Sequence, residues 1–65
     1  MNDYVRYGIV ESEDGTWDVV DLVYQRVEQT GLSHELAQAR AFRMAAATDT
    51  RPYVSIEEFT IPRGA

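Results

Sequence analysis

The chain has 65 residues, no cysteine, an apolar content of 45% and a formal net charge of −5. This length predicts a single small domain over residues 1–65, and the absence of cysteine excludes disulfides and thiolate metal sites. The apolar content argues against a disordered chain, and the acidic charge argues against binding to nucleic acid or to a membrane surface.

Residues 4–11 predict the first strand, because their alternation places Val5, Tyr7 and Ile9 on one face. The pair Asp14-Gly15 follows, and it is typical of the positive-φ positions of a tight hairpin turn. A second strand is therefore expected to begin at Thr16 or Trp17.

The segment from 17 to 29 allows two interpretations. Wound as a helix, it gathers its polar residues on one side and its valines on the other, which is the pattern of an amphipathic helix. Its four valines, one tyrosine and one tryptophan are better suited to strands, and the hairpin turn requires a strand directly after it. We therefore expect strands at 17–21 and 26–30 with a connection at 22–25, and the alternative is one helix over 17–29.

The stretch "WDVVD…RVEQTGLSHELAQARAFRMA" resembles a pattern found in small bacterial and phage proteins of uncharacterised function. In that pattern a W-x-V-V-D strand and a second strand ending in G-L-S or G-L-T lead into an alanine-rich helix. The matching positions are Trp17, Val19, Val20, Asp21, Val27, Gly31, Leu32, Ser33, Ala37, Ala41 and Met44. The resemblance implies strand–turn–strand–helix and brings no known activity with it.

A fainter similarity links the chain to the amino-terminal domain of HicB-type antitoxins. That domain also opens with an alternating strand, an acidic glycine turn and a capped helix. The chain departs from it by lacking the Pro-Asp-Leu-Pro-Gly stretch, so the similarity implies no functional residue here.

Ser33 is predicted to cap a helix over 34–47, which Pro52 prevents from continuing. Residues 53–61 predict a last strand whose apolar parity changes between Ile56 and Phe59, and a bulge at Glu57–Glu58 would restore a single apolar face. The predicted fold is α+β: a three- or four-stranded, largely antiparallel sheet with one helix packed across it, in the order β-β-β-α-β. The strand order stays open.

The predicted helix carries apolar residues on two sides. Ala37, Ala41, Met44 and Ala45 form a core stripe, whereas Ala39, Phe42 and Ala46 lie nearly opposite, with two arginines between the stripes. The second stripe either wraps over the edge of the sheet or forms an interface with another chain. The candidate interface comprises Leu36, Ala39, Arg40, Phe42, Arg43 and Ala46.

Two other groups of residues are candidates for function. Acidic side chains crowd the first hairpin at Glu11, Glu13, Asp14 and Asp18, which predicts either a solvated loop or an acidic patch facing a basic partner. The single histidine, His34, falls in the first turn of the predicted helix and lacks the companions that a zinc site needs. No catalytic, metal or cofactor site is predicted, because no nucleophile elbow or phosphate-binding loop occurs.

The residues favour a small non-catalytic protein-interaction module that associates with itself or with another protein. The alternatives are an acidic inhibitor or antitoxin-like protein that binds a basic target, and a weak nucleic-acid binder that uses Arg40 and Arg43. The first residues show no secretory signal pattern, and no stretch approaches the roughly 20 apolar residues of a spanning helix. A cytoplasmic location is therefore expected.

Overall fold

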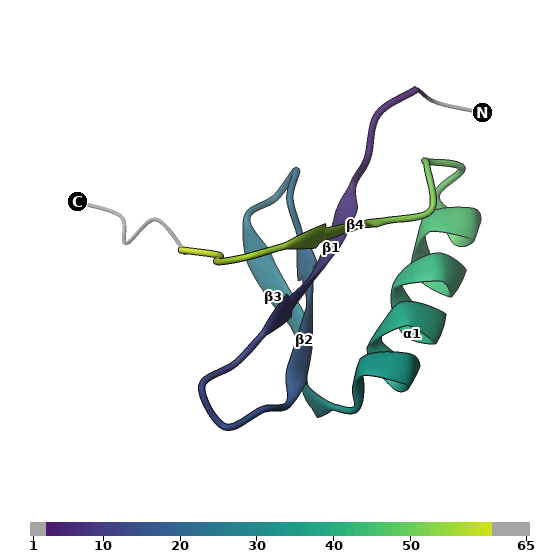
Figure 1. Cartoon of the computed structure of the whole chain (residues 1–65). Helices are drawn as coiled ribbons and strands as arrows, with labels where there is room; N and C mark the ends of the chain where they lie inside the picture. The colour runs from purple at the N-terminus through teal and green to yellow at the C-terminus, as the bar shows by residue number, and fades with distance from the viewer. Residues whose placement is uncertain (1–2, 61–65) are drawn as a thin grey trace.

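A computed structural model describes residues 3–60 and shows the predicted α+β architecture in the predicted order (Figure 1). The elements are β1 (Tyr7–Glu11), β2 (Trp17–Asp21), β3 (Arg26–Leu32), α1 (His34–Ala47) and β4 (Val54–Ile56). The strands form one sheet in the order β3-β2-β1-β4, antiparallel except for the parallel pair of β1 and β4. The last strand therefore pairs with the first, and α1 lies against one face of the sheet.

The hairpin between β1 and β2 forms where the sequence predicts it, with one difference. The Gly15 amide donates to the Ser12 carbonyl at 3.0 Å, and the Ser12 amide donates to the Thr16 carbonyl at 2.7 Å. Gly15 has a φ of 86°, whereas Asp14 has no positive φ, so the prediction of two positive-φ positions is wrong. The loop between Ser12 and Thr16 is longer than a two-residue turn, and a loop of this length needs only one residue with a positive φ. Glycine adopts a positive φ at little cost.

The segment from 17 to 29 forms two strands, so the single-helix alternative is wrong. The connection spans residues 22–25 as predicted, and β3 continues to Leu32 instead of ending at residue 30. Asp21 holds the connection: its Oδ1 accepts from the amides of Val23 and Tyr24 at 2.9 and 3.0 Å. An aspartate that accepts amide hydrogen bonds two and three residues on favours a turn over a helix.

Both edges of the sheet are poor templates for pairing with another chain. The register of β3 against β2 shifts twice, between Trp17 and Val19 and between Val19 and Val20, and Gly31 near the end of β3 has a φ of 72°. At the other edge β4 is only three residues long. Bulges and short edge strands are the features by which sheets avoid edge-to-edge pairing.

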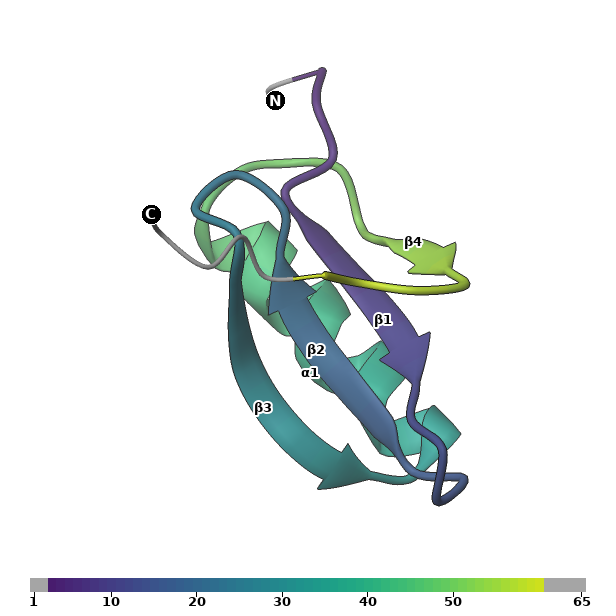
Figure 2. The same ribbon diagram turned by 90° about the vertical axis from the view of Figure 1, so that its left-hand side faces the viewer.

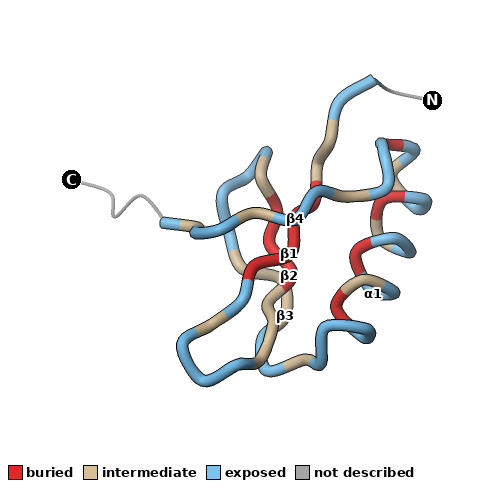
Figure 3. The backbone as a smooth tube through the Cα atoms, viewed as in Figure 1, coloured by how far each residue is buried: buried red, intermediate tan, exposed pale blue. Residues whose placement is uncertain are grey.

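Helix α1 begins and packs as predicted. Ser33 caps it, since its Oγ accepts from the Leu36 amide at 3.1 Å. The buried face of α1 is made of alanines, whose small side chains let the helix lie close to the sheet; Figure 3 shows this inner side as buried and the outer side as mostly exposed. The core cluster comprises Tyr7, Ile9, Val19, Ala37, Ala41 and Ala45, with Trp17, Leu32, Met44 and Tyr53 packed against it.

The last strand is shorter than the sequence suggests. β4 ends at Ile56, and residues 57–60 leave the sheet, so the predicted strand with a bulge at Glu57–Glu58 is wrong there, while Ile61 lies outside the described residues. Figure 2 shows this segment crossing back over β1 toward β2 on the face opposite α1. The parity change after Ile56 therefore marks a change of direction, which brings Phe59 over the second face of the sheet.

Candidate interaction surfaces

The six residues of the predicted interface all lie on the exposed side of α1. Phe42 is 57% exposed and Leu36 is 42% exposed, and they share this side of the helix with the exposed Ala39 and Ala46. Phe42 therefore does not wrap over the edge of the sheet. Because the buried alanines hold the opposite side of α1 against the sheet, this second stripe faces solvent.

Four of the six predicted residues line one shallow groove. The groove, called here the helix groove, is lined by Gln38, Ala39, Phe42, Arg43, Ala46 and Tyr53. Leu36 and Arg40 are exposed elsewhere on α1 and do not line it. Tyr53 also lines the groove but was not among the predicted interface residues. Its position after Pro52, where the chain returns from the helix to the sheet, was a usable signal.

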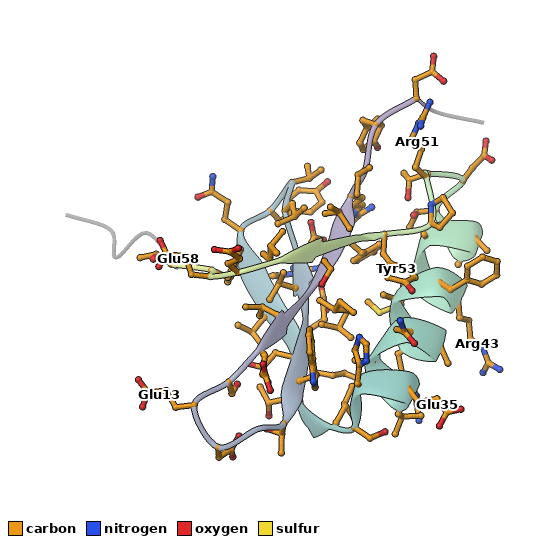
Figure 4. The ribbon with its side chains drawn as sticks, in the orientation of Figure 1. Glu13, Glu35, Arg43, Arg51, Tyr53 and Glu58 are labelled. Atoms are coloured by element: carbon orange, nitrogen blue, oxygen red, sulfur yellow. The ribbon has the colours of Figure 1, made fainter. Side chains whose placement is uncertain are left out.

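The charge around the helix groove is sparse and positive. Among the described residues that line it, Arg43 is the only charged one, and the rest are apolar or neutral. The two arginines of the nucleic-acid alternative, Arg40 and Arg43, lie three residues apart on the exposed side of α1, and Arg43 alone of the two lines the groove. Figure 4 shows Arg43 extending outward from α1 on the side away from the sheet.

The predicted acidic patch divides into two parts. Glu11, Glu13 and Asp18 line a second groove, called here the sheet groove, on the face of the sheet opposite α1. Asp14 instead turns back on its own loop, where its Oδ1 accepts from the hydroxyl and the amide of Thr16 at 2.7 and 3.0 Å. These hydrogen bonds, led by the Thr16 hydroxyl, lower the pKa of Asp14.

The sheet groove also contains residues from a distant segment that were not part of the predicted patch. Glu57, Glu58 and Phe59 belong to the segment after β4 and reach the groove because that segment crosses back over the sheet. The sequence feature that marks this change of path is the shift of apolar parity after Ile56, from which a bulge was predicted. A β-bulge and a change of chain direction both shift the parity of the apolar residues, so the sequence pattern cannot distinguish them.

Asp21, the last residue of the W-x-V-V-D match, has a structural place in the fold. Its side chain is fully buried, and its Oδ2 accepts from Nε and Nη2 of Arg6 at 3.1 and 3.0 Å. Burial alone would raise the pKa of Asp21, but the hydrogen bonds from the Tyr24 amide, the Arg6 guanidinium and the Val23 amide outweigh it and lower the pKa. The Arg6 guanidinium also lies over the rings of Tyr7 and Tyr24.

His34 lies at the exposed start of α1, as the sequence suggests, and stacks on Trp17 with 4.3 Å between the ring centroids. Within residues 3–60 no group of three or more histidine and acidic side chains is arranged to hold a metal ion. The same part of the chain contains no helix that is both long and apolar enough to cross a membrane. The helix groove and the sheet groove lie on opposite sides of the molecule, and a further groove beside the first hairpin is lined by residues that include Trp17, Ser55 and Ile56.

Comparison of the chain with protein-family models, with curated proteins and with solved structures gave no match. The resemblance to the bacterial and phage pattern therefore rests on its own residues.

Proposed function

We propose that the protein is a small non-catalytic interaction module that associates with a second copy of itself through the helix groove. The observation that carries this proposal is the exposure of Phe42, which is 57% accessible in the middle of a second apolar stripe on α1. Fully burying a phenylalanine stabilises a contact by about 1.5 to 3 kcal/mol. Because Phe42 is still more than half exposed, a partner that covers it would gain more than half of this free energy.

The shape of the helix groove suits another helix. Ala39 and Ala46 lie seven residues apart, two helical turns, with Phe42 between them. Small side chains permit two helix axes to approach to about 8 Å. In an antiparallel pair related by a two-fold axis, Ala39 of each copy would lie beside Ala46 of the other, and the two Phe42 rings would meet near the axis. Arg43 would extend from the rim into solvent.

The remaining routes to self-association are less favourable. The bulged strand β3 and the three-residue strand β4 offer poor edges for strand addition. A standard interface buries about 800 Å² per partner, which is a large share of the 4612 Å² that this chain exposes. One helix face provides less than that area, so the association is expected to be weak, in the micromolar range.

Sedimentation velocity of the wild type beside Phe42→Glu tests the proposal, over concentrations from about 10 μM to about 1 mM. The wild type should shift from monomer toward dimer across this range, and Phe42→Glu should stay monomeric because it buries a charge at the contact. Val23→Glu is the matched control, since Val23 is 50% exposed in the β2–β3 connection, away from the helix groove. A wild type that remains monomeric at the highest concentration, or a dimer unaffected by Phe42→Glu, contradicts the proposal.

A further inference from the structure

The sheet has two apolar faces, and α1 covers only one of them. On the other face, Val10 and Val20 are buried and Val27 is half-buried. The segment 57–60 crosses this face (Figure 2), and its half-buried Phe59 lines the same groove as the three valines. Val27 and Phe59 therefore supply the partly accessible apolar floor of the sheet groove, above the buried Val10 and Val20. The groove has a volume of about 450 Å³, which lies in the range of ligand-binding clefts.

The rim of the sheet groove carries one sign of charge. Five carboxylates line it, from Glu11, Glu13, Asp18, Glu57 and Glu58, and no arginine, lysine or histidine of the described residues does so. Glu13 and Glu58 come from segments far apart in the sequence, and Figure 4 shows both on the side of the sheet away from α1. Carboxylates gathered beside an apolar surface repel one another, and a cationic ligand relieves that repulsion.

We propose that the sheet groove binds a basic peptide segment of a partner protein, with aliphatic side chains on its floor and arginine or lysine side chains at its rim. The apolar floor selects against a purely ionic ligand, and the uniform negative rim selects against neutral or acidic segments. An extended segment in which basic and aliphatic residues alternate fits both requirements, because successive side chains of an extended chain point to opposite sides. The inference is independent of self-association, since the helix groove lies on the opposite side of the sheet.

The test is a titration of the ¹⁵N-labelled full chain with three capped peptides, followed by amide chemical shifts. The first alternates arginine with leucine, the second alternates arginine with serine, and the third alternates glutamate with leucine. We expect the first to shift the amides of Val10, Val20 and Val27, and to bind at least about tenfold more tightly than the other two. Its affinity should fall steeply as salt is raised, because the exposed charges are screened.

A pair of double variants assigns the binding to the groove. Glu57→Gln with Glu58→Gln removes two charges from the rim and should weaken the first peptide by about tenfold, a fold-change of the size that two lost ion pairs produce. Asp3→Asn with Glu35→Gln removes the same charge from exposed positions outside the groove and should leave the affinity nearly unchanged. Equal weakening by both double variants would mean that only net charge matters and would overturn the proposal. Equal binding of the arginine–serine peptide, shifts confined to α1, or no shifts would also overturn it.

Discussion

At the scale of single residues, the fold depends most visibly on Asp21. Its buried carboxylate accepts four hydrogen bonds, two from the amides of the β2–β3 connection and two from Arg6. A buried charge is tolerated only when such partners compensate its lost hydration. The partners make Asp21 the residue that turns the segment from 17 to 29 into two strands. This also gives a physical meaning to the aspartate of the W-x-V-V-D match.

The pH dependence of stability tests this role. The pKa of Asp21 is lowered in the folded chain, so the unfolded chain binds the proton first, with a pKa near the usual value of about 3.9. The stabilisation is therefore present above about pH 4 and is lost as the pH falls through the folded pKa. At pH 7 we expect Asp21→Asn to lower the free energy of unfolding by about 2 to 3 kcal/mol, and this difference should shrink toward pH 3.

Urea unfolding at several pH values measures both effects. Asp18→Asn is the matched control, because Asp18 is half-buried and accepts one hydrogen bond, from the Ser12 hydroxyl at 3.0 Å. It should cost less than about 1 kcal/mol. If the loss caused by Asp21→Asn were as small as that of Asp18→Asn, or did not change with pH, Asp21 would not hold the fold in the way described.

At the scale of elements, local signals predicted most of the fold. Strand alternation, an Asp-Gly turn, a serine cap and a proline stop correctly predicted β2, α1 and the order of all five elements. The first strand was predicted over 4–11 but begins at Tyr7, because Val5 forms only an isolated bridge with Arg51. The strand order could not be predicted, because nothing local distinguishes a last strand at one edge from a last strand at the other. The path after Ile56 was missed for a related reason. Phe59 packs beside valines of β1, β2 and β3, and these distant residues cannot be identified from the sequence of residues 57–60.

The serine cap of α1 makes an element-scale prediction. Ser33→Ala removes the hydroxyl that accepts from the Leu36 amide, so the free energy of unfolding should fall by about 1 kcal/mol. Amide hydrogen exchange at Leu36 should become faster at the same time. Ser55→Ala, at an exposed serine of β4, is the control and should change neither quantity appreciably. Unchanged exchange at Leu36 in Ser33→Ala would show that the cap does not hold the start of the helix.

The residues of the helix groove could be predicted only in part from the sequence. The 3.6-residue period correctly placed Ala39, Phe42 and Ala46 on the side of α1 that faces away from the sheet. It could not decide whether another segment covers Phe42, because that depends on the path of residues after Pro52. The chain passes beside Phe42 and leaves it open, with Tyr53 forming one wall of the groove.

At the scale of the whole molecule, a thin sheet-and-helix domain leaves two apolar surfaces incompletely covered. One is the outer side of α1, which is bordered by a positive charge, and the other is the second face of the sheet, which is bordered by five carboxylates. A chain of this size buries a smaller share of its surface than a larger domain does. We therefore expect association at either groove to add to the buried surface, and the opposite charges beside the two grooves favour the two different partners proposed above.

The central claim is that the helix groove joins two copies of the chain, and an isotope-filtered NOE experiment tests it most directly. Equal amounts of labelled and unlabelled chain are mixed at about 1 mM, where a micromolar dimer is nearly fully formed. The account predicts contacts between copies from the Phe42 ring to the methyl groups of Ala39 and Ala46. Contacts between copies that arise instead from β3, or the absence of any, would contradict it.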